Sequence, residues 1–257
     1  MNFAHGVQNY LEAASIQGLA AEEICKIAAP FFAENLQVLD LGSGTGFVAR
    51  EILKQVQDDE NIRSRHPELV SGSPSIFELD LALEMLQQSP SPNSQKIQAD
   101  FENLPFKNNS FDILISSFAL QWLTDFDKSF SQFFSLLKPE GVFIFCLPCD
   151  GSLAELSAAN IFNFNQLPKV EDLKNSLKKS GFSEISVETK TTKQTFESGV
   201  AALKSLKKIG ANYSQKNSKV ITKTNLAQFN NFCLKNFGTD TRKIEVSWVI
   251  SYFIFSK

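Results

Sequence analysis

The stretch Val38-Leu39-Asp40-Leu41-Gly42-Ser43-Gly44-Thr45-Gly46 decides the fold of this chain. It continues the apolar run of residues 36–41 and leads into the helical pattern of residues 48–56, so it predicts a strand, a glycine-rich turn and a helix. Glycines at alternate positions let the backbone approach a ligand closely, and the helix start directs its amides at that ligand. We therefore expect a binding site where this strand ends.

Two nucleotide-binding loops fit this stretch poorly. A phosphate-binding loop requires Lys after its last glycine, but Phe47 follows Gly46. A dinucleotide loop requires Gly at position 47, and Asp40 would then place a carboxylate beside a doubly negative pyrophosphate. A carboxylate here instead suits a ligand that carries an ammonium and a sulfonium, which describes S-adenosylmethionine.

Further polar residues stand where other predicted strands end. Asp80, followed by Leu81, ends the strand at residues 75–79 and can accept both ribose hydroxyls, although a helix N-cap is its alternative role. Asp100 and Phe101 follow the next strand and can offer a carboxylate to the adenine amino group and a ring beside the base. Ser116 ends the fourth strand at the same edge. The predicted cofactor-binding set is Asp40, Gly42, Ser43, Gly44, Gly46, Asp80, Leu81, Asp100, Phe101 and Ser116.

Strands and helices alternate along the first half of the chain, which predicts an α/β fold with a doubly wound, mostly parallel sheet and helices on both faces. The expected strands are residues 36–41, 75–79, 96–99, 111–117, 142–147, 183–192 and 244–255. The expected helices lie before Pro30 and at residues 48–56, near Met85, and at 128–137, 170–179, 197–209 and 224–236, with a turn at Lys138–Gly141.

This pattern predicts a single domain over residues 1–257. Within it we expect an N-terminal helical lid at 1–35, a cofactor-binding core at 36–150 and a basic C-terminal part at 151–257 that completes the sheet and the acceptor site. Residues 57–74 are polar and contain two prolines and a glycine, so we interpret them as a surface insertion. Without this insertion, Asp80 follows Asp40 at the usual spacing.

Composition excludes several other classes of protein. With 43% hydrophobic and 21% charged residues, the chain is neither disordered nor collagenous. Its longest apolar run, Gly141–Pro148, is far below the roughly 18 residues of a membrane span, and Met1–Tyr10 lacks a signal pattern, so we expect a cytoplasmic protein. Only His5 and His66 offer imidazole, and a lone Cys146/Cys149 pair is interpreted as two incidental thiols, so we expect no metal site.

The net charge of −3 hides an asymmetry between two parts of the chain. Residues 1–164 carry 9 Lys+Arg against 21 Asp+Glu, whereas residues 165–257 carry 16 against 7. Fifteen of those sixteen cations are lysines. The basic part is either a solvated, lysine-rich face or a docking surface for an acidic partner.

The cofactor motif and several further segments together resemble class I S-adenosylmethionine-dependent methyltransferases, and in particular the malonyl-[acyl-carrier protein] O-methyltransferases of biotin (pimeloyl) synthesis. The resemblance covers nearly the whole chain. The segments that carry it are Phe3-Ala4, Tyr10, Leu104-Pro105-Phe106, Ala119-Leu120-Gln121-Trp122, Gly151-Ser152-Leu153-Ala154-Glu155-Leu156 and Leu203–Ala211.

This resemblance implies a Rossmann-like seven-stranded sheet, S-adenosylmethionine as cofactor and methyl transfer to the free carboxylate of a malonyl thioester on acyl carrier protein. Such a carboxylate is already ionised at neutral pH, so no general base is needed and no catalytic residue is assigned. It further implies that Tyr10 caps the site as a lid and that Gln121 and Trp122 line the acceptor pocket. Lys204 and Lys207 would steer the malonyl carboxylate or the carrier's phosphopantetheine, and the acidic carrier would dock on the basic C-terminal part.

Two departures leave alternatives open. The family would have an arginine just before Leu167-Pro168, yet Asn163–Gln166 contains none, and Lys204 stands where Arg is common. The alternatives are a methyltransferase-fold assembly factor for a respiratory complex that acts on a protein side chain, and a non-catalytic relative that binds the cofactor. Nucleic-acid methylation is disfavoured because an N-P-P-[YF] signature is absent and the basic part lacks arginines and interleaved aromatics.

Overall fold

The computed structural model describes residues 15–33, 35–58, 74–209, 213–215 and 221–257. Two features expected from the sequence fall largely outside these ranges: the first part of the N-terminal lid with Tyr10, and the insertion at 57–74, of which only its first two residues and Pro74 are described. The chain divides into two compact units. We call Gln17–Leu147, Val170–Glu188 and Ser251–Lys257 the core unit; Pro148–Lys169 and Thr189–Ile250, with the described end of Met1–Ile16, form the second unit.

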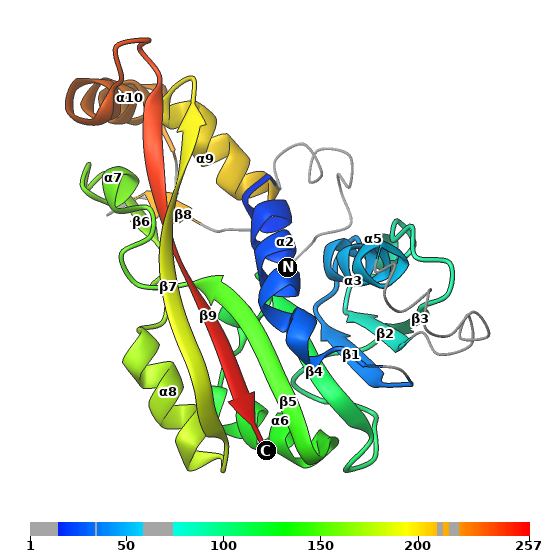
Figure 1. The fold of residues 1–257 in the computed structure, drawn as a ribbon. Coiled ribbons are helices and arrows are strands. Elements are labelled where there is room, and N and C mark those ends of the chain that lie inside the picture. Colours follow the sequence, from blue (N-terminus) through cyan, green and yellow to red (C-terminus); the bar gives the residue numbers. More distant parts are fainter. Residues whose placement is uncertain (1–14, 34, 59–73, 210–212, 216–220) are drawn as a thin grey trace. The chain divides into compact units, whose positions relative to one another are not determined.

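Seven strands form one sheet in the order β3-β2-β1-β4-β5-β9-β7 (Figure 1). Their bounds are β1 Gln37–Leu41, β2 Ser75–Asp80, β3 Gln95–Gln98, β4 Phe111–Ser117, β5 Leu137–Pro148, β7 Ser183–Phe196 and β9 Ile244–Ser256. Strands β1 to β5 pair in parallel. The end of β9 lies antiparallel to β5. The Lys257 amide donates to the Gly141 carbonyl at 2.9 Å, and Phe253 stacks on Phe145. The predicted mostly parallel, seven-stranded α/β sheet is confirmed.

The strand order reverses direction at β1, since β2 and β3 extend the sheet on one side of it and β4 and β5 on the other. In open parallel sheets, the connections leave a crevice at this point, at the carboxyl ends of the strands. The glycine-rich turn follows β1 directly, so the topology places it at this crevice.

The helices connect these strands, and a second, two-stranded sheet pairs β6 Phe162–Phe164 with β8 Tyr213–Gln215. The helix bounds are α2 Ser15–Ala28, η1 Ala29–Phe31, α3 Phe47–Asp58, α5 Leu83–Leu86, η3 Leu120–Trp122, α6 Phe126–Leu136, α7 Ala154–Ser157, α8 Val170–Lys179, α9 Gly199–Lys208 and α10 Lys223–Phe237. In the core unit α6 packs on α8, and in the second unit α9 packs on α10. Among the described helices, none combines the length and the apolar character that crossing a membrane would require.

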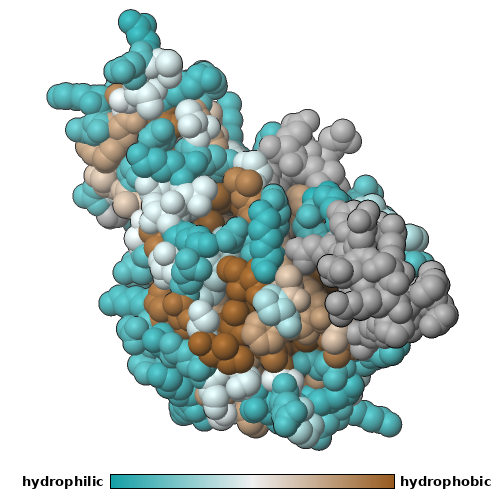
Figure 2. All heavy atoms as spheres, in the orientation of Figure 1, coloured by the Kyte–Doolittle hydropathy of each residue, from teal (hydrophilic) through white to brown (hydrophobic). Residues whose placement is uncertain are grey.

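Phenylalanine fills the interior of the core unit. Phe130, Phe133, Phe143 and Phe145 are fully buried, and the ring centroids of Phe143 and Phe145 lie 4.6 Å apart. Figure 2 shows mostly hydrophilic residues around the periphery and hydrophobic residues gathered over β5 and β9. The apolar run at Gly141–Pro148, read from the sequence as a buried strand, therefore forms the centre of the core.

The prediction of a turn between two elements at Lys138–Gly141 is wrong, because these residues lie within β5, which begins at Leu137. The chain accommodates the Pro139-Glu140 sequence by a left-handed residue, Glu140 at φ 64°, and by a shift of register against β4 between Phe111 and Ile113. The turn signal therefore marks an irregularity inside a strand. The short elements α7, β6 and β8 were not predicted.

Candidate functional site

The glycine-rich turn lies between β1 and α3 in a conformation that favours glycine. Gly42, Gly44 and Gly46 have φ values of 71°, 57° and 76°. The Gly42 and Ser43 amides donate to the Leu79 carbonyl at 2.8 and 2.9 Å, which ties the turn to the end of β2. The alternating glycines are thus explained by backbone geometry that residues with a Cβ rarely adopt.

Two of these glycines also leave no room for a side chain. A Cβ at Gly42 would lie 2.3 Å from the Ala119 Cβ, and a Cβ at Gly46 would lie 2.2 Å from Ser89 Oγ and 2.8 Å from Glu78 Oε2. The Phe101 ring comes within 3.6 Å of the Cβ position at Gly42. The structure therefore brings Phe101 to the turn, and its role beside the base stays a prediction.

Asp80 meets the turn from the end of β2. Its Oδ2 accepts from the Gly44 amide at 2.9 Å and its Oδ1 accepts from the Ala82 amide at 2.8 Å. Burial raises the pKa of the Asp80 carboxyl, while the hydrogen bonds from Ala82, Gly44 and Leu81 oppose this rise. The contact with Gly44 joins residues 36 positions apart, across the insertion. Asp80 is not the N-cap of α5, because Ala82 holds that position without a side-chain cap. Leu81 beside it is 65% exposed.

Asp40 is fully buried at the end of β1, and neither of its carboxylate oxygens hydrogen-bonds to a described residue. Its partner in the parallel register is Glu78, also fully buried, whose Oε2 likewise lacks a partner among the described residues. Burial raises the pKa of Asp40 well above its ordinary value, and the carboxylates of Glu78 and Asp80 raise it further. A buried acidic group of this kind is stabilised by a positive charge brought next to it.

Glu78 was not among the predicted site residues. Its Oε1 accepts from the Ser94 hydroxyl, and its neighbour in the register on β3 is Lys96, whose Nζ donates to the Ser89 carbonyl at 2.8 Å. A glutamate between Phe77 and Leu79 of β2 was the available sequence signal, because the interior of a buried parallel strand rarely holds a charge.

Two further residues of the predicted cofactor-binding set, Asp100 and Ser116, form hydrogen bonds with the backbone. Asp100 Oδ1 accepts from the Glu102 amide at 2.8 Å and so stabilises the turn after β3. Ser116 is fully buried, and its hydroxyl donates to the Leu41 carbonyl at 2.6 Å. The Ser116 hydroxyl proton is therefore engaged by the backbone of β1, and this residue braces the strand end from which the turn departs.

Gln121 and Trp122 form part of the short helix η3 that follows β4 in the core unit. The Gln121 Nε2 donates to the Phe118 carbonyl at 2.8 Å, and Phe118 itself is left-handed at φ 54°. The Gln121 Oε1 is buried without a hydrogen bond to any described residue. Gln121 thus keeps an acceptor and one amide hydrogen for a ligand, while Trp122 is half-buried.

Lys204 and Lys207 lie on α9 in the second unit, where Lys208 joins them. All three are exposed, and no ion pair links them to another residue in the described part of the chain. By contrast, lysines on α8 are paired: Lys174 and Lys178 contact Glu184, and Lys179 contacts Asp127. Tyr10 lies outside the described residues.

Comparisons with known proteins agree with this geometry. A family model described as a methyltransferase domain matches residues 32–217. The malonyl-[acyl-carrier protein] O-methyltransferase of Buchnera aphidicola subsp. Baizongia pistaciae is 29% identical over 236 residues, which cover 88% of this chain and 86% of that relative. "Arginine-hydroxylase NDUFAF5, mitochondrial" of Mus musculus is 29% identical over 196 residues, covering 71% of this chain and 52% of that relative.

Among solved structures, a methyltransferase from Bacillus halodurans superimposes with a TM-score of 0.64 at 15% identity, covering 92% of this chain and 98% of that one. At such low identity the match demonstrates a shared fold. The family model, in contrast, spans well over half of the sequence. The chain therefore belongs to the methyltransferase-domain family and has the class I fold of S-adenosylmethionine-dependent methyltransferases.

Proposed function

We propose that this protein transfers a methyl group from S-adenosylmethionine to the free carboxylate of a malonyl thioester carried on acyl carrier protein. The observation that carries the methyl-transfer part is the intact glycine turn beside a buried Asp40 without a hydrogen-bonding partner among the described residues. The acceptor is supported by the similarity to malonyl-[acyl-carrier protein] O-methyltransferase, which extends over 88% of this chain.

The residues around the turn fit S-adenosylmethionine by their charge and shape. Asp40 and Glu78 form a buried acidic pair that would be compensated by the ligand's ammonium and sulfonium charges. Asp80 would accept the ribose hydroxyls with the lone pairs that its hydrogen bonds from backbone amides leave free. Phe101 and the exposed Leu81 would offer apolar surface to the adenine, with Asp100 near its amino group.

When bound, this cofactor supplies an electrophilic methyl group on a positively charged sulfur. In the proposed transfer, a carboxylate oxygen of the malonyl group would form the new bond to the methyl carbon, and the carbon–sulfur bond would break with its electron pair left on sulfur. No proton moves, because a carboxylate is already ionised at neutral pH. The protein therefore has to hold oxygen and carbon about 3–3.5 Å apart and in line. We assign Gln121, which keeps an unpaired amide oxygen among the described residues, and Trp122 to the lining of the acceptor site.

The lysines of α9 support the proposed acidic partner. The excess positive charge of residues 165–257 is partly neutralised by ion pairs on α8, β7 and β9, including Lys193 with Glu245 and Lys243 with Glu197. Lys204, Lys207 and Lys208 form no such pair with a described residue and share one exposed helix face. We therefore assign carrier docking to this face of α9 and not to the basic part as a whole.

A second candidate is modification of a protein side chain, as the name of the mitochondrial arginine-hydroxylase suggests for that relative. Two observations favour it: 29% identity over 196 residues, and the absence of arginine from Asn163–Gln166, where a carboxylate-binding fork would be expected. This chain covers only about half of that relative, 52%, so the similarity leaves much of that protein unmatched.

The test is methyl transfer from methyl-labelled S-adenosylmethionine to malonyl, acetyl and unacylated acyl carrier protein, measured by the intact mass of the carrier. We expect the mass gain of a single methyl group on the malonyl form alone. Labelling of all three forms would indicate a side chain of the carrier as acceptor and refute the proposal. Cofactor binding without any labelled carrier, with calorimetry as control for a competent protein, would refute the acceptor while keeping the cofactor site.

A further inference from the structure

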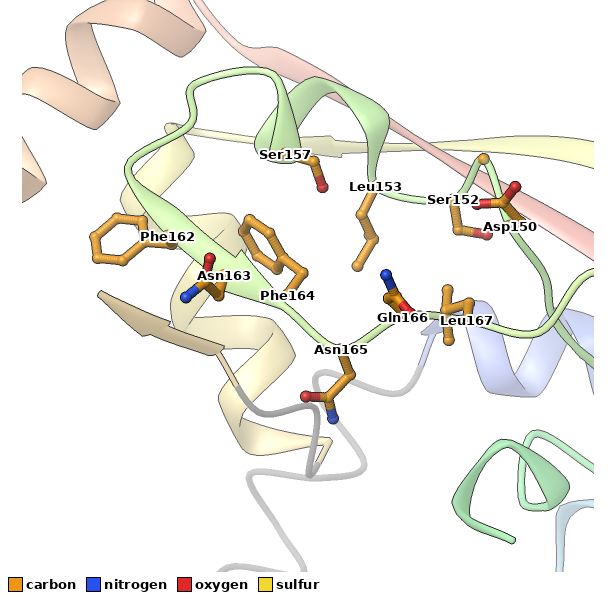
Figure 3. A pocket seen from close by; sticks show the side chains of 11 residues that line it. Asp150, Ser152, Leu153, Ser157, Phe162, Asn163, Phe164, Asn165, Gln166 and Leu167 are labelled. Atoms are coloured by element: carbon orange, nitrogen blue, oxygen red, sulfur yellow. The ribbon is translucent and has the colours of Figure 1, made fainter. Parts of the chain in front are cut away.

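A groove in the second unit lies outside every site residue considered so far. It has a volume of about 270 Å³ and is formed by residues between Asp150 and Leu167, from the end of β5 through α7 and β6 to the loop before α8 (Figure 3). The Leu153 and Gln166 side chains point toward one another across it, and Ser157 points into it from α7. In the sequence this stretch drew attention for two reasons: residues 151–156 carry part of the family resemblance, and Asn163–Gln166 lacks the arginine expected there.

The wall of this groove is held by residues about a hundred positions away in the sequence. Ser152 Oγ accepts from the Val249 amide at 2.9 Å and donates to the Val249 carbonyl at 3.1 Å. The Leu153 amide donates to the Ser247 carbonyl at 2.8 Å. Leu153 is left-handed at φ 60°, an unusual conformation for leucine that persists where surrounding contacts enforce it. The groove is therefore built on β9 and does not depend on a ligand for its shape.

The lining is almost entirely uncharged. It presents two hydroxyls, three carboxamides, four apolar side chains and one carboxylate, which belong to Ser152 and Ser157; Asn163, Asn165 and Gln166; Leu153, Phe162, Phe164 and Leu167; and Asp150. No Lys or Arg is among the lining residues. The carboxamides and hydroxyls supply both donors and acceptors, so they match a ligand that also has both.

These features exclude a carboxylate as the favoured occupant. A carboxylate in a concave site is best stabilised by a cation, which the lining lacks, and Asp150 would repel it. An amide-bearing chain meets no such penalty, because its N–H and C=O groups pair with carboxamides and hydroxyls while its methylene and methyl groups pack on Phe164 and Leu153.

We propose that this groove binds the uncharged, amide-bearing pantetheine arm of the acyl carrier and does not bind the malonyl carboxylate. The inference rests on the proposed function for the identity of the arm. It assigns to Asn163 and Gln166 the recognition of amides, and it explains why this segment functions without the arginine that carboxylate recognition would require.

A matched pair of variants at the end of α7, Ser157 and the C-cap residue Ala158, tests the groove. Ser157→Trp fills it, whereas Ala158→Trp adds the same ring at the next, exposed position, which does not line it. We expect Ser157→Trp to raise the KM for malonyl-pantetheine about tenfold or more and to raise the inhibition constant of acetyl-pantetheine by the same factor, since both share the arm. Ala158→Trp should change neither constant, and both variants should bind S-adenosylmethionine as the wild type does.

The possible outcomes distinguish failure of the inference about the groove from failure of the proposed function. A rise in KM for malonyl-pantetheine without a rise in the inhibition constant of acetyl-pantetheine would mean that the groove holds the carboxylate, which overturns the inference. Gln166→Arg provides a second test. A lower KM for malonyl-pantetheine in this variant would also overturn the inference that the groove does not bind the carboxylate. If the wild type methylates no malonyl carrier, calorimetry with acetyl-pantetheine still tests the groove. Binding to the wild type and to Ala158→Trp but not to Ser157→Trp would support the groove as the site of the pantetheine arm. No binding to the wild type would refute this inference.

Discussion

The glycine turn and the groove are both binding surfaces, yet they are built in opposite ways. The turn uses backbone groups and acids from residues that end adjacent parallel strands, such as Gly44 and Asp80. The groove uses uncharged side chains on a connecting segment whose wall is held by β9, through Ser152 and Val249. At Gly42 and Gly46 the turn has no room for a side chain, whereas the lining of the groove consists of separate side chains. We expect the cofactor to be a fixed property of the fold and the acceptor to vary.

The largest effect should come from adding one methyl group to the turn. Gly46→Ala forces a Cβ to 2.2 Å from Ser89 Oγ and to 2.8 Å from Glu78 Oε2 at a φ of 76°. We expect a loss of about 2 kcal/mol or more in the free energy of unfolding, and loss of cofactor binding. Urea denaturation and calorimetry with S-adenosylmethionine measure the two effects.

Gly18→Ala is the matched control, because Gly18 lies in α2 with only an ordinary contact, 3.6 Å from the Phe47 ring. There the same substitution should be neutral or stabilise by up to about 1 kcal/mol, because alanine is the better helix former. Equal destabilisation by both variants would contradict the view that the turn is fixed by its backbone conformation.

A smaller, opposed pair of effects is expected at Asp40. Asp40→Asn replaces a buried carboxyl beside Glu78 with an amide that stays neutral at every pH. Without ligand, the variant should be more stable than the wild type at neutral pH by about 1–2 kcal/mol. Its affinity for S-adenosylmethionine should fall about tenfold or more, because the ligand's positive charge loses its partner.

The pH dependence gives the sign of this effect. The pKa of Asp40 in the folded protein is raised above the ordinary 3.8, so the folded state holds a proton that the unfolded state releases. The raised pKa of Asp40 therefore contributes stability that is fully present below pH 3.8. The wild type loses this stability as the pH rises from 3.8 toward the folded-state pKa. The stability difference between Asp40→Asn and wild type should grow with pH over this window; a constant difference in denaturation experiments would refute the assignment.

The smallest effect is expected on α9. Reversing the charge of Lys204, Lys207 and Lys208 to Glu should raise the KM for a malonyl carrier several-fold, about 3- to 30-fold, and more at low salt than at high salt. The KM for malonyl-pantetheine, which lacks the carrier, should stay unchanged. Reversal of Lys174 and Lys178 on α8, which are already paired with Glu184, is the control and should affect stability more than the KM. An equal rise in the KM for the malonyl carrier after charge reversal on α9 and on α8 would refute the docking role of α9.

Much of the fold could be predicted because local signals and tertiary demands agree. The strand at Phe111–Ser117 and the helix at Val170–Lys179 have the bounds that their apolar patterns predict. Local signals were insufficient where the deciding contact is distant. The turn expected at Lys138–Gly141 lies inside β5 as a bulge between Leu137 and Val142, which pair with β4, and the Gly141 carbonyl accepts from the amide of Lys257 beyond β9. The three-residue strands β6 and β8 are too short to show a period.

The sequence by itself determined the glycine turn, the acids at the strand ends and the alternating α/β order, because each depends on the conformational preferences of neighbouring residues and on apolar periodicity. Only the tertiary structure decided that Glu78 lies beside Asp40, that Ser116 braces β1, that the α9 lysines are unpaired among the described residues, and that the segment Asp150–Leu167 forms an uncharged groove. The physical reason is that charge pairing, burial and concavity are properties of residues that meet only when distant strands such as β5 and β9 come together.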